Sequence, residues 1–414
     1  PENDLRQTIE DLQGAPASSE KLERARTLFC LTLDTPDGLK IQTIHSFCQS
    51  LLKRFPLEAG LTPFFEVADD TEQHGLIKKA SQIVLENPTL QVPLQELILR
   101  FSESTLEELN SFILQSRTSF ETCVSQEIDE TLQTINITKE GLLKSLITNI
   151  PEEELKKGIP LLEQGSPTDQ ERGKKLSLYF SLSENEKIQN YESYLIIFLT
   201  LQGEKRARLL TQKIALASPS LKDLLEDEAL RLENWMERFN ALEISIVSKA
   251  FLHYSLAFLE AYENLKKAQS LLDYDDLILK TVSLLKNPGC HWVLYKLDGG
   301  LDHILVDEAQ DTNPAQWQVI RAIAEEFYAN AAADQRNRTL FIVGDGKQSI
   351  YSFQGADPVV FTQMQHDLRT FAKNSGKKWE DIDLTVSFRS TPEVLATVDA
   401  VFSSSPLSSM PLQH

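Results

Sequence analysis

The chain has 414 residues, of which 41% are hydrophobic, so it can bury a large core and is expected to form two or three subdomains. Its formal net charge of −20 argues against a protein that coats nucleic acid by bulk attraction, but it is compatible with a local basic channel. No run of eighteen apolar residues occurs, so we predict neither a membrane-spanning helix nor a membrane partner.

The cysteines predict a cytoplasmic protein. They lie far apart, and neither a C-x-x-C pair nor a metal-like spacing of His and Cys occurs. We therefore expect them to be reduced packing residues. They are Cys30, Cys48, Cys123 and Cys290.

The first element expected in chain order is an amphipathic helix from Thr43 to Phe55, which Pro56 ends. From about residue 69 to residue 258, long helical patterns alternate with short breakers such as Gly158-Ile159-Pro160. Few β-branched runs interrupt these patterns. This stretch predicts a separate helical subdomain.

Strands and helices alternate after Gly299. Ile304-Leu305-Val306 and Leu340-Phe341-Ile342-Val343 predict two buried strands. Strand, polar tip and capped helix in succession are typical of a parallel α/β sheet. The predicted fold is therefore α/β at both ends of the chain, with a helical insertion between them. Three helices are expected to begin at prolines that follow capping residues: Pro314, Pro358 and Pro392.

Both predicted strands end in polar residues. Asp307-Glu308 follows the first strand, and Gly344-Asp345-Gly346-Lys347-Gln348 ends the second. Because the carboxyl ends of parallel strands meet at one edge of a sheet, we expect a shared pocket for a metal and a triphosphate. Asp307 is placed to hold Mg²⁺, usually through water, and Glu308 to orient and deprotonate the attacking water. The alternative is a strand that ends in an ordinary polar turn.

The glycine-rich loop that normally cradles the phosphates, G-x-x-x-x-G-K-[ST], does not occur in the sequence. No Gly-Lys pair has a Gly five residues upstream, and none is followed by Ser or Thr. The chain also begins with Pro1 rather than Met. We therefore expect an internal fragment that lacks this Walker A loop and its N-terminal strand, and that hydrolyses ATP very poorly by itself.

Four segments occur in a fixed order, with the helical insertion between the first and the second. They are Thr43-Ile44-His45-Ser46-Phe47-Cys48, Val306-Asp307-Glu308-Ala309-Gln310-Asp311, the run from Val343 to Asp357, and Ser387-Phe388-Arg389-Ser390. Together they resemble the UvrD/Rep-like DNA helicases. The stretches from Leu272 to Leu277 and from Tyr295 to His303 narrow the resemblance to the AddA family of helicase-nuclease subunits, of the alphaproteobacterial type. These proteins belong to bacterial AddAB double-strand-break repair complexes.

The resemblance implies a RecA-like lobe, a parallel sheet with flanking helices, that carries a large all-helical inserted subdomain. Residues 1–68 and 259–384 would form this lobe. Residues 69–258 would form the insertion, and residues 385–414 would begin a second RecA-like lobe. The implied activity is ATP-dependent unwinding of DNA in double-strand-break repair and recombination, with ATP and Mg²⁺ as cofactors.

The resemblance also assigns roles to single residues in the nucleotide site. Gln348 would sense the γ-phosphate and couple the nucleotide state to the grip on DNA. Arg389 would enter the site from the second lobe and stabilise charge in the transition state. The alternatives are a turn-capping amide for Gln348 and a structural salt bridge for Arg389.

DNA contacts are expected at two places. Thr43, His45 and Ser46 stand at a helix N-terminus, which suits a backbone phosphate, and by resemblance they contact the single strand. Bases can stack on Tyr351 and Phe353, although both rings could instead pack in the core. By resemblance the partners are single- and double-stranded DNA and an AddB-like protein, and the intact protein carries a C-terminal nuclease domain beyond this chain.

Two other function classes fit parts of the sequence. A protein that keeps the fold but works as a DNA or protein scaffold would explain the missing loop, whereas Asp307, Glu308, Gln348 and Arg389 oppose that interpretation. A P-loop ATPase that is not a helicase would share the acidic strand tip. It would lack the segment from Gln348 to Ala356 and the Phe388-Arg389 pair.

Overall fold

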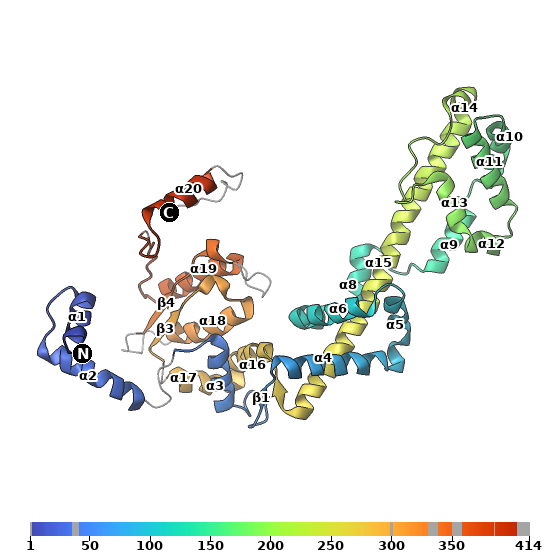
Figure 1. Ribbon diagram of the computed structural model, residues 1–414. Helices are drawn as coiled ribbons and strands as arrows, with labels where there is room; N and C mark the ends of the chain where they lie inside the picture. Colours follow the sequence, from blue (N-terminus) through green and yellow to red (C-terminus); the bar gives the residue numbers. More distant parts are fainter. Residues whose placement is uncertain are drawn as a thin grey trace. The chain divides into compact units, whose positions relative to one another are not determined.

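A computed structural model describes residues 2–34, 41–298, 301–329, 338–349, 358–384 and 386–403, and helices make up most of it (Figure 1). The chain divides into two compact units. Unit 1 combines Pro1–Val67 with Leu272–His414, and unit 2 is the continuous stretch Ala68–Leu271. Unit 2 therefore interrupts the sequence of unit 1.

Unit 1 contains a parallel pair of strands with helices packed beside it. Its helices are α1 (Glu2–Gln13), α2 (Ser19–Asp34), α3 (Ile44–Arg54), α16 (Tyr274–Lys286), α17 (His291–Asp298), α18 (Pro314–Ala329), α19 (Pro358–Asn374) and α20 (Pro392–Ser403). Its short 3₁₀ turns are η2 (Pro288–Cys290), η3 (Ala309–Asp311) and η4 (Gly346–Gln348). The second lobe expected from residue 385 stays a prediction, since α20 is grouped with unit 1.

The strands of unit 1 are β3 (His303–Val306) and β4 (Thr339–Ile342), and they pair in parallel. The register places His303 opposite Thr339 and Val306 opposite Ile342. The two strands predicted from the sequence are therefore neighbours, and they end at the same edge. α18 makes the crossover connection between them, as parallel pairing requires.

The expectation that both strands are buried is wrong for one of their faces. Residues alternate between exposed and half-buried along β3 and β4, and Leu305 and Phe341 are 74% and 53% exposed. Their neighbours Val306 and Ile342 pack against the core. Within the described residues the sheet of β3 and β4 has two strands, and its face that carries Leu305 and Phe341 is exposed.

Two apolar clusters hold unit 1 together. In the larger one, α3 packs on α16 through Cys48, Leu51 and Leu52, and α17 and α18 complete the cluster. The smaller one lies between α18 and α19 and includes Trp317 and Leu368. Because α18 contributes to both clusters, it fixes the strands against α3, whose N-cap is Thr43.

Unit 2 is entirely helical apart from one isolated bridge in its described residues. Its elements are α4 (Asp70–Leu85), η1 (Pro88–Leu90), α5 (Gln91–Ile98), α6 (Glu103–Gln115), α7 (Arg117–Thr122), α8 (Ser125–Leu132), α9 (Lys139–Thr148), α10 (Glu152–Glu163), α11 (Pro167–Phe180), α12 (Glu184–Gln189), α13 (Tyr191–Phe198), α14 (Gln212–Ala217) and α15 (Pro219–Gln269). Two short strands, β1 (Glu66–Val67) and β2 (Leu271–Leu272), pair where the chain enters and leaves this unit.

Helix α15 is the central helix of unit 2. It has 51 residues, and shorter helices pack along it (Figure 1). One apolar cluster forms where α4 and α5 meet its C-terminal half, and a second forms around its N-terminal half with α9 to α14. The domain boundary predicted at residue 258 falls inside α15. The helix continues to Gln269 because no Pro or Gly interrupts it, and Ser270 ends it in a left-handed conformation, φ 53°.

Among the described residues, α15 is long and apolar enough to cross a membrane by length and composition alone, with a mean hydropathy of 1.3 over eighteen residues. Central helices of helical bundles satisfy the same criterion. Apolar residues of α15 pack into both clusters of unit 2, and 39% of this window is buried.

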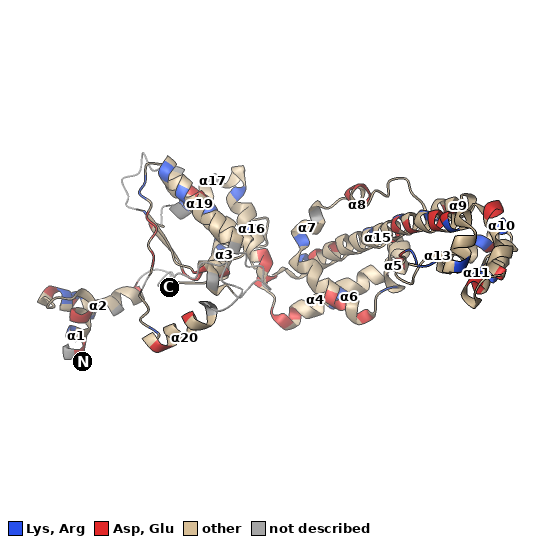
Figure 2. Cartoon of the chain, turned by 90° about the horizontal axis from the view of Figure 1, so that it is seen from above, with Lys and Arg blue, Asp and Glu red and all other residues tan. Residues whose placement is uncertain are grey.

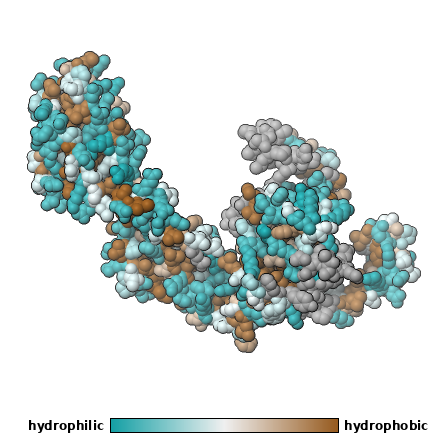
Figure 3. All heavy atoms as spheres, turned by 180° about the vertical axis from the view of Figure 1, so that it is seen from behind, coloured by the Kyte–Doolittle hydropathy of each residue, from teal (hydrophilic) through white to brown (hydrophobic). Residues whose placement is uncertain are grey.

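The acidity of the sequence is spread over helix surfaces. Figure 2 shows acidic and basic residues interspersed along α15 and the helices beside it. Several are exposed pairs one turn apart, such as Lys144 with Glu140 at 2.7 Å. Figure 3 shows small apolar groups scattered among polar residues on the surface of unit 2. All four cysteines are unpaired. Cys48 and Cys290 are buried, whereas Cys30 is exposed, so the expectation that it is a packing residue is wrong.

Candidate functional site

The tips of β3 and β4 are held together by backbone hydrogen bonds beyond the strands. The Val343 N–H donates to the Val306 carbonyl at 2.8 Å, and the Ala309 N–H donates to the Val343 carbonyl at 2.9 Å. These two bonds bring Glu308 beside the Gly344-Asp345 backbone. The residues that the sequence predicted at two separate strand ends therefore lie at one place.

Asp307 and Glu308 project from this edge into solvent, and both are exposed. The Glu308 N–H donates to Oδ1 of Asp307 at 3.0 Å. Glu308 has φ 48° and ψ 44°, a left-handed conformation at the point where β3 turns into η3. This turn presents two adjacent carboxylates at the carboxyl end of the sheet, where open α/β sheets bind their ligands.

Gln310 connects the two tips, and sequence reasoning missed this function. Its side chain is buried, with 1% of the residue exposed. Its Nε2 donates to Oε2 of Glu308 at 2.7 Å, and its Oε1 accepts from the Asp345 N–H at 2.9 Å. The only signal in the sequence was an uncharged amide two residues after Glu308, which can donate and accept at once.

Gln348 extends this chain of hydrogen bonds. It ends η4, and its N–H donates to the Asp345 carbonyl at 2.9 Å. Its side-chain Nε2 donates to Oδ2 of Asp345 at 3.0 Å. Glu308, Gln310, Asp345 and Gln348 are therefore joined in series, and the exposed amide of Gln348 stands on the same edge as the two carboxylates.

The start of α3 has the predicted cap. Oγ1 of Thr43 accepts from the Ser46 N–H at 3.2 Å, and the two hydroxyls are 3.0 Å apart. Both residues are exposed. The ring of His45 meets the ring of Tyr274 edge-on at 5.7 Å, and burial lowers the pKa of His45, although the nearby Asp275 opposes this shift. His45 is therefore favoured as a neutral ring at pH 7.

The remaining predicted residues are not joined to this edge. Arg389 is exposed in a bend before α20, and within the described residues no hydrogen bond or ion pair links it to Asp307, Glu308 or Gln348. Tyr351 and Phe353 lie outside the described residues. Asp273 and Asp276 form a capping box at the start of α16, so both carboxylates cap a helix.

The donor set at the edge suits a magnesium-bound nucleotide. In the described chain no three His, Cys, Asp or Glu side chains gather in a group that could hold a metal by themselves. Mg²⁺ in nucleotide sites is commonly held by one or two carboxylates together with phosphate oxygens and water. Asp307 and Glu308 supply two adjacent carboxylates, which is within that smaller requirement.

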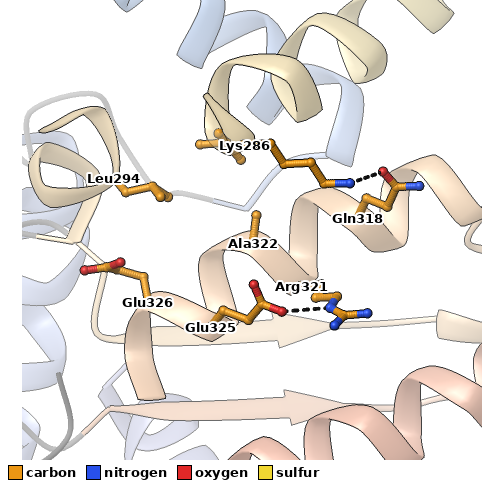
Figure 4. A pocket seen from close by; sticks show the side chains of 8 residues that line it. Lys286, Leu294, Gln318, Arg321, Ala322, Glu325 and Glu326 are labelled. Atoms are coloured by element: carbon orange, nitrogen blue, oxygen red, sulfur yellow. Dashed lines mark hydrogen bonds and ion pairs between the residues drawn. The ribbon is translucent and has the colours of Figure 1, made fainter. Parts of the chain in front are cut away.

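A separate open pocket of about 690 Å³ lies between α16, α17 and α18 (Figure 4). Its polar side chains already have partners, since Lys286 bonds to Gln318 at 2.8 Å and Arg321 pairs with Glu325 at 2.8 Å. Asp367 also accepts from Arg321 at 3.2 Å. The pocket contains none of the predicted site residues, and its pairing gives no sign of a ligand.

The chain is similar to one protein-family model and to several proteins that share a name. The model of the UvrD/REP helicase N-terminal domain matches residues 5–244 and 225–369. A protein from Oceanobacillus iheyensis, named as the A subunit of an ATP-dependent helicase/nuclease, is 26% identical over an alignment of 408 positions, which covers 87% of this chain and 31% of that protein. The Bacillus pumilus protein of the same name is 24% identical with the same coverage.

A shorter region is more similar. The protein of that name from Lactobacillus helveticus is 35% identical over 151 residues, 36% of this chain and 12% of that protein. The chain spans about a third of the length of the relatives that it matches along most of its own sequence.

Proposed function

Because the chain belongs to the UvrD/REP helicase family, we propose that it forms the ATP-hydrolysing part of an ATP-dependent DNA helicase and translocase. The observation that carries the proposal is the series of hydrogen bonds that joins Glu308 to Gln348 across the two strand tips. It gives one edge the two carboxylates and the amide that phosphoryl transfer to water requires.

Each residue at this edge has one task. Asp307 would hold the Mg²⁺ that accompanies ATP, and the ion would neutralise charge on the phosphates. Glu308 orients the attacking water and takes its proton. Gln348 senses the γ-phosphate from the neighbouring strand. Arg389 stabilises charge in the transition state when the second lobe closes on the nucleotide.

The proposed fold is a RecA-like lobe in unit 1 interrupted by a helical subdomain in unit 2. The continuous sequence of unit 2 and the parallel pairing of β3 and β4 support it. The exposed side chains of Leu305 and Phe341 support it as well, since parallel sheets are normally covered on both faces. Further elements of the full-length protein, with the phosphate-binding loop among them, would cover that face.

DNA would be gripped beside the nucleotide site. Thr43, His45 and Ser46 at the start of α3 contact the backbone of the single strand, and the two hydroxyls are exposed there. Tyr351 and Phe353 follow Gln348 closely in sequence. A change of the bound nucleotide that moves Gln348 would therefore also move a base stacked on either ring. Closure of the two lobes on ATP would then step the strand forward.

The full-length protein is proposed to be a helicase-nuclease of the AddA type. Relatives that are named as A subunits of ATP-dependent helicase/nucleases support this assignment. It places the protein in the cytoplasm, in double-strand-break repair and recombination, with an AddB-like partner and a C-terminal nuclease domain. The alphaproteobacterial subtype stays a prediction, because the relatives named here come from other bacteria.

The test is Glu308→Gln in the full-length protein. Loss of the proton acceptor should lower DNA-stimulated ATP turnover by about 10²–10⁴-fold. Binding of a fluorescent ATP analogue should change little, since the amide keeps the size and polarity of the side chain. Glu325→Gln is the matched control, because Glu325 pairs with Arg321 away from the site, and its turnover should equal the wild type.

Unchanged turnover in Glu308→Gln would remove Glu308 from its assigned task. If the wild-type full-length protein also binds DNA without hydrolysing ATP, a scaffold function replaces the motor.

A further inference from the structure

Gln310 is a buried side chain whose two polar atoms are both used at the site. Its amide nitrogen donates to the Glu308 carboxylate at 2.7 Å, and its oxygen accepts from the Asp345 backbone at 2.9 Å. Only 1% of the residue is exposed, although both of its partners stand at the solvent edge of the sheet. The side chain thus connects Glu308 to a residue that is 35 positions from Gln310 in the sequence.

We propose that Gln310 is a positioning residue. Its side-chain amide orients the Glu308 carboxylate, and the Gly344-Asp345 backbone determines where that amide lies. A movement of the β4 tip, which also carries Gln348, would then turn the Glu308 carboxylate toward or away from the water that it activates. This inference rests on the proposed function, and it assigns to Gln310 the link between the nucleotide sensor and the general base.

The side chain at position 310 needs the length of glutamine and a neutral amide. A glutamate in its place has no N–H to donate and sets a second negative charge against Glu308. A methionine has a similar length and is apolar, so it fills the space and makes neither bond. The amide at position 310 is therefore needed for its two hydrogen bonds, because a methionine would fill the same space equally well.

Gly344 leaves the space that the Gln310 amide occupies. A Cβ atom at position 344 would lie 2.9 Å from Oε1 of Gln310 and 3.2 Å from the Cβ of Ala309. The Ser349 hydroxyl also donates to the Gln310 carbonyl at 3.3 Å, so the backbone of Gln310 is tied to the same segment. An alanine at position 344 would displace the amide without changing Gln310 itself.

The test compares Gln310→Met with the wild type in the full-length protein. Without nucleotide, hydrogen exchange of the Asp345 amide should become faster, because its acceptor is lost. With ATP and single-stranded DNA, kcat should fall about 10–100-fold, the range seen when an orienting neighbour of a catalytic ligand is removed. The KM for ATP and the affinity for a fluorescent ATP analogue should stay within about twofold, since Gln310 is not expected to touch the nucleotide.

Gln316→Met is the matched control. Gln316 lies six positions along the chain, and its Oε1 accepts from the Asn313 N–H at 3.0 Å in the cap of α18. This variant loses one structural hydrogen bond of a half-buried glutamine, so its unfolding temperature should fall, though less than that of Gln310→Met, which loses two. Its kcat and its stimulation by DNA should equal the wild type.

Gly344→Ala is the second variant, and it should lower kcat in the same way. The double variant Gly344→Ala, Gln310→Met should lose less than the product of the two single effects, because both act on one amide. If Gln310→Met keeps the wild-type kcat, or loses kcat only in proportion to its own loss of folded protein, the positioning function is wrong. Turnover that survives Glu308→Gln would instead overturn the proposed function, so the two failures are distinguishable.

Discussion

At the scale of the residue, Glu308 is held in a backbone conformation that favours glycine. Its φ of 48° and ψ of 44° are left-handed, which costs a non-glycine residue about 1 kcal/mol. The backbone bonds of Val306 and Ala309 to Val343 fix the chain on both sides of it. The residue proposed as the general base is therefore also a point of local strain.

Comparison of Glu308→Gly with Glu308→Ala isolates that strain, because both changes remove the carboxylate and only glycine relaxes the backbone. We expect the glycine variant to be about 1 kcal/mol more stable to urea than the alanine variant, while neither turns over ATP. Equal stability would mean that the left-handed conformation carries no strain here.

In unit 2, Asp129 is the centre of a small polar cluster. Hydrogen bonds from Ser245, Lys249 and Thr134 lower the pKa of Asp129 to about 2 from its usual 3.8. A carboxyl with a depressed pKa stabilises the fold above its unfolded pKa, and this stabilisation disappears as the pH falls toward the folded value.

Asp129→Asn should therefore lower the free energy of unfolding by about 1–2 kcal/mol at pH 7, and the difference from the wild type should shrink between about pH 4 and pH 2. Urea unfolding at several pH values measures this. The control is Glu140→Gln, whose exposed pair with Lys144 should matter little. A difference that stays constant down to about pH 3 would contradict the assignment.

The sequence alone predicts the function of a residue when its interaction partners lie nearby along the chain. Asp307 and Glu308 were identifiable as site candidates because an apolar run ends at them. Gln310 was not, because its second partner, Asp345, is brought near only by the pairing of β3 with β4. Nothing local in the sequence indicates which strands pair.

At the scale of the element, the helices followed from spacing and end signals. The helix predicted from Thr43 to Phe55 is confirmed as α3, with Thr43 as its N-cap and Phe55 as its C-cap. The exposure of Leu305 was not predictable in the same way. An apolar run says that a strand has an apolar face, whereas the burial of that face depends on which other elements cover it.

The packing of α10 on α15 depends on Gly158. A Cβ at this position would clash with Cδ1 of the buried Leu221. Alanine favours a helix over glycine by about 1 kcal/mol, but overpacking a core typically costs about 1–3 kcal/mol. We expect Gly158→Ala to lower the unfolding temperature, as measured by circular dichroism.

Gly75→Ala in α4 is the matched control for this prediction. The glycine is also inside a helix of unit 2, but no atom lies within 4 Å of its added Cβ. The alanine should therefore raise stability by about 0.5–1 kcal/mol. If both variants are stabilised, Leu221 moves aside without cost, and the packing of α10 on α15 does not depend on Gly158.

At the scale of the whole molecule, the net charge of −20 and the proposed grip on DNA are compatible, because some of the acidic side chains on helix surfaces are paired with basic ones one turn away. The sequence indicated the division into two units by a change from alternating strands and helices to long helical patterns with few β-branched runs. Its C-terminal boundary was not, since α15 runs past the predicted limit without a break.

The chain of 414 residues alone should show negligible DNA-stimulated ATPase activity, since it contains no G-x-x-x-x-G-K-[ST] loop to hold the phosphates. A coupled assay with saturating single-stranded DNA, beside the full-length protein as control, measures this. Robust activity of the chain alone would show that the phosphates are held by other residues.

The interrupted sequence of unit 1 has a consequence for the nascent polypeptide. The apolar side of α3 packs on α16, yet all of unit 2 is translated between them. At roughly 5–20 residues per second, α3 emerges from the ribosome about 10–40 s before its partner does. During that interval Cys48, Leu51, Leu52 and Phe55 face water, and this short stretch is where a chaperone would be needed first.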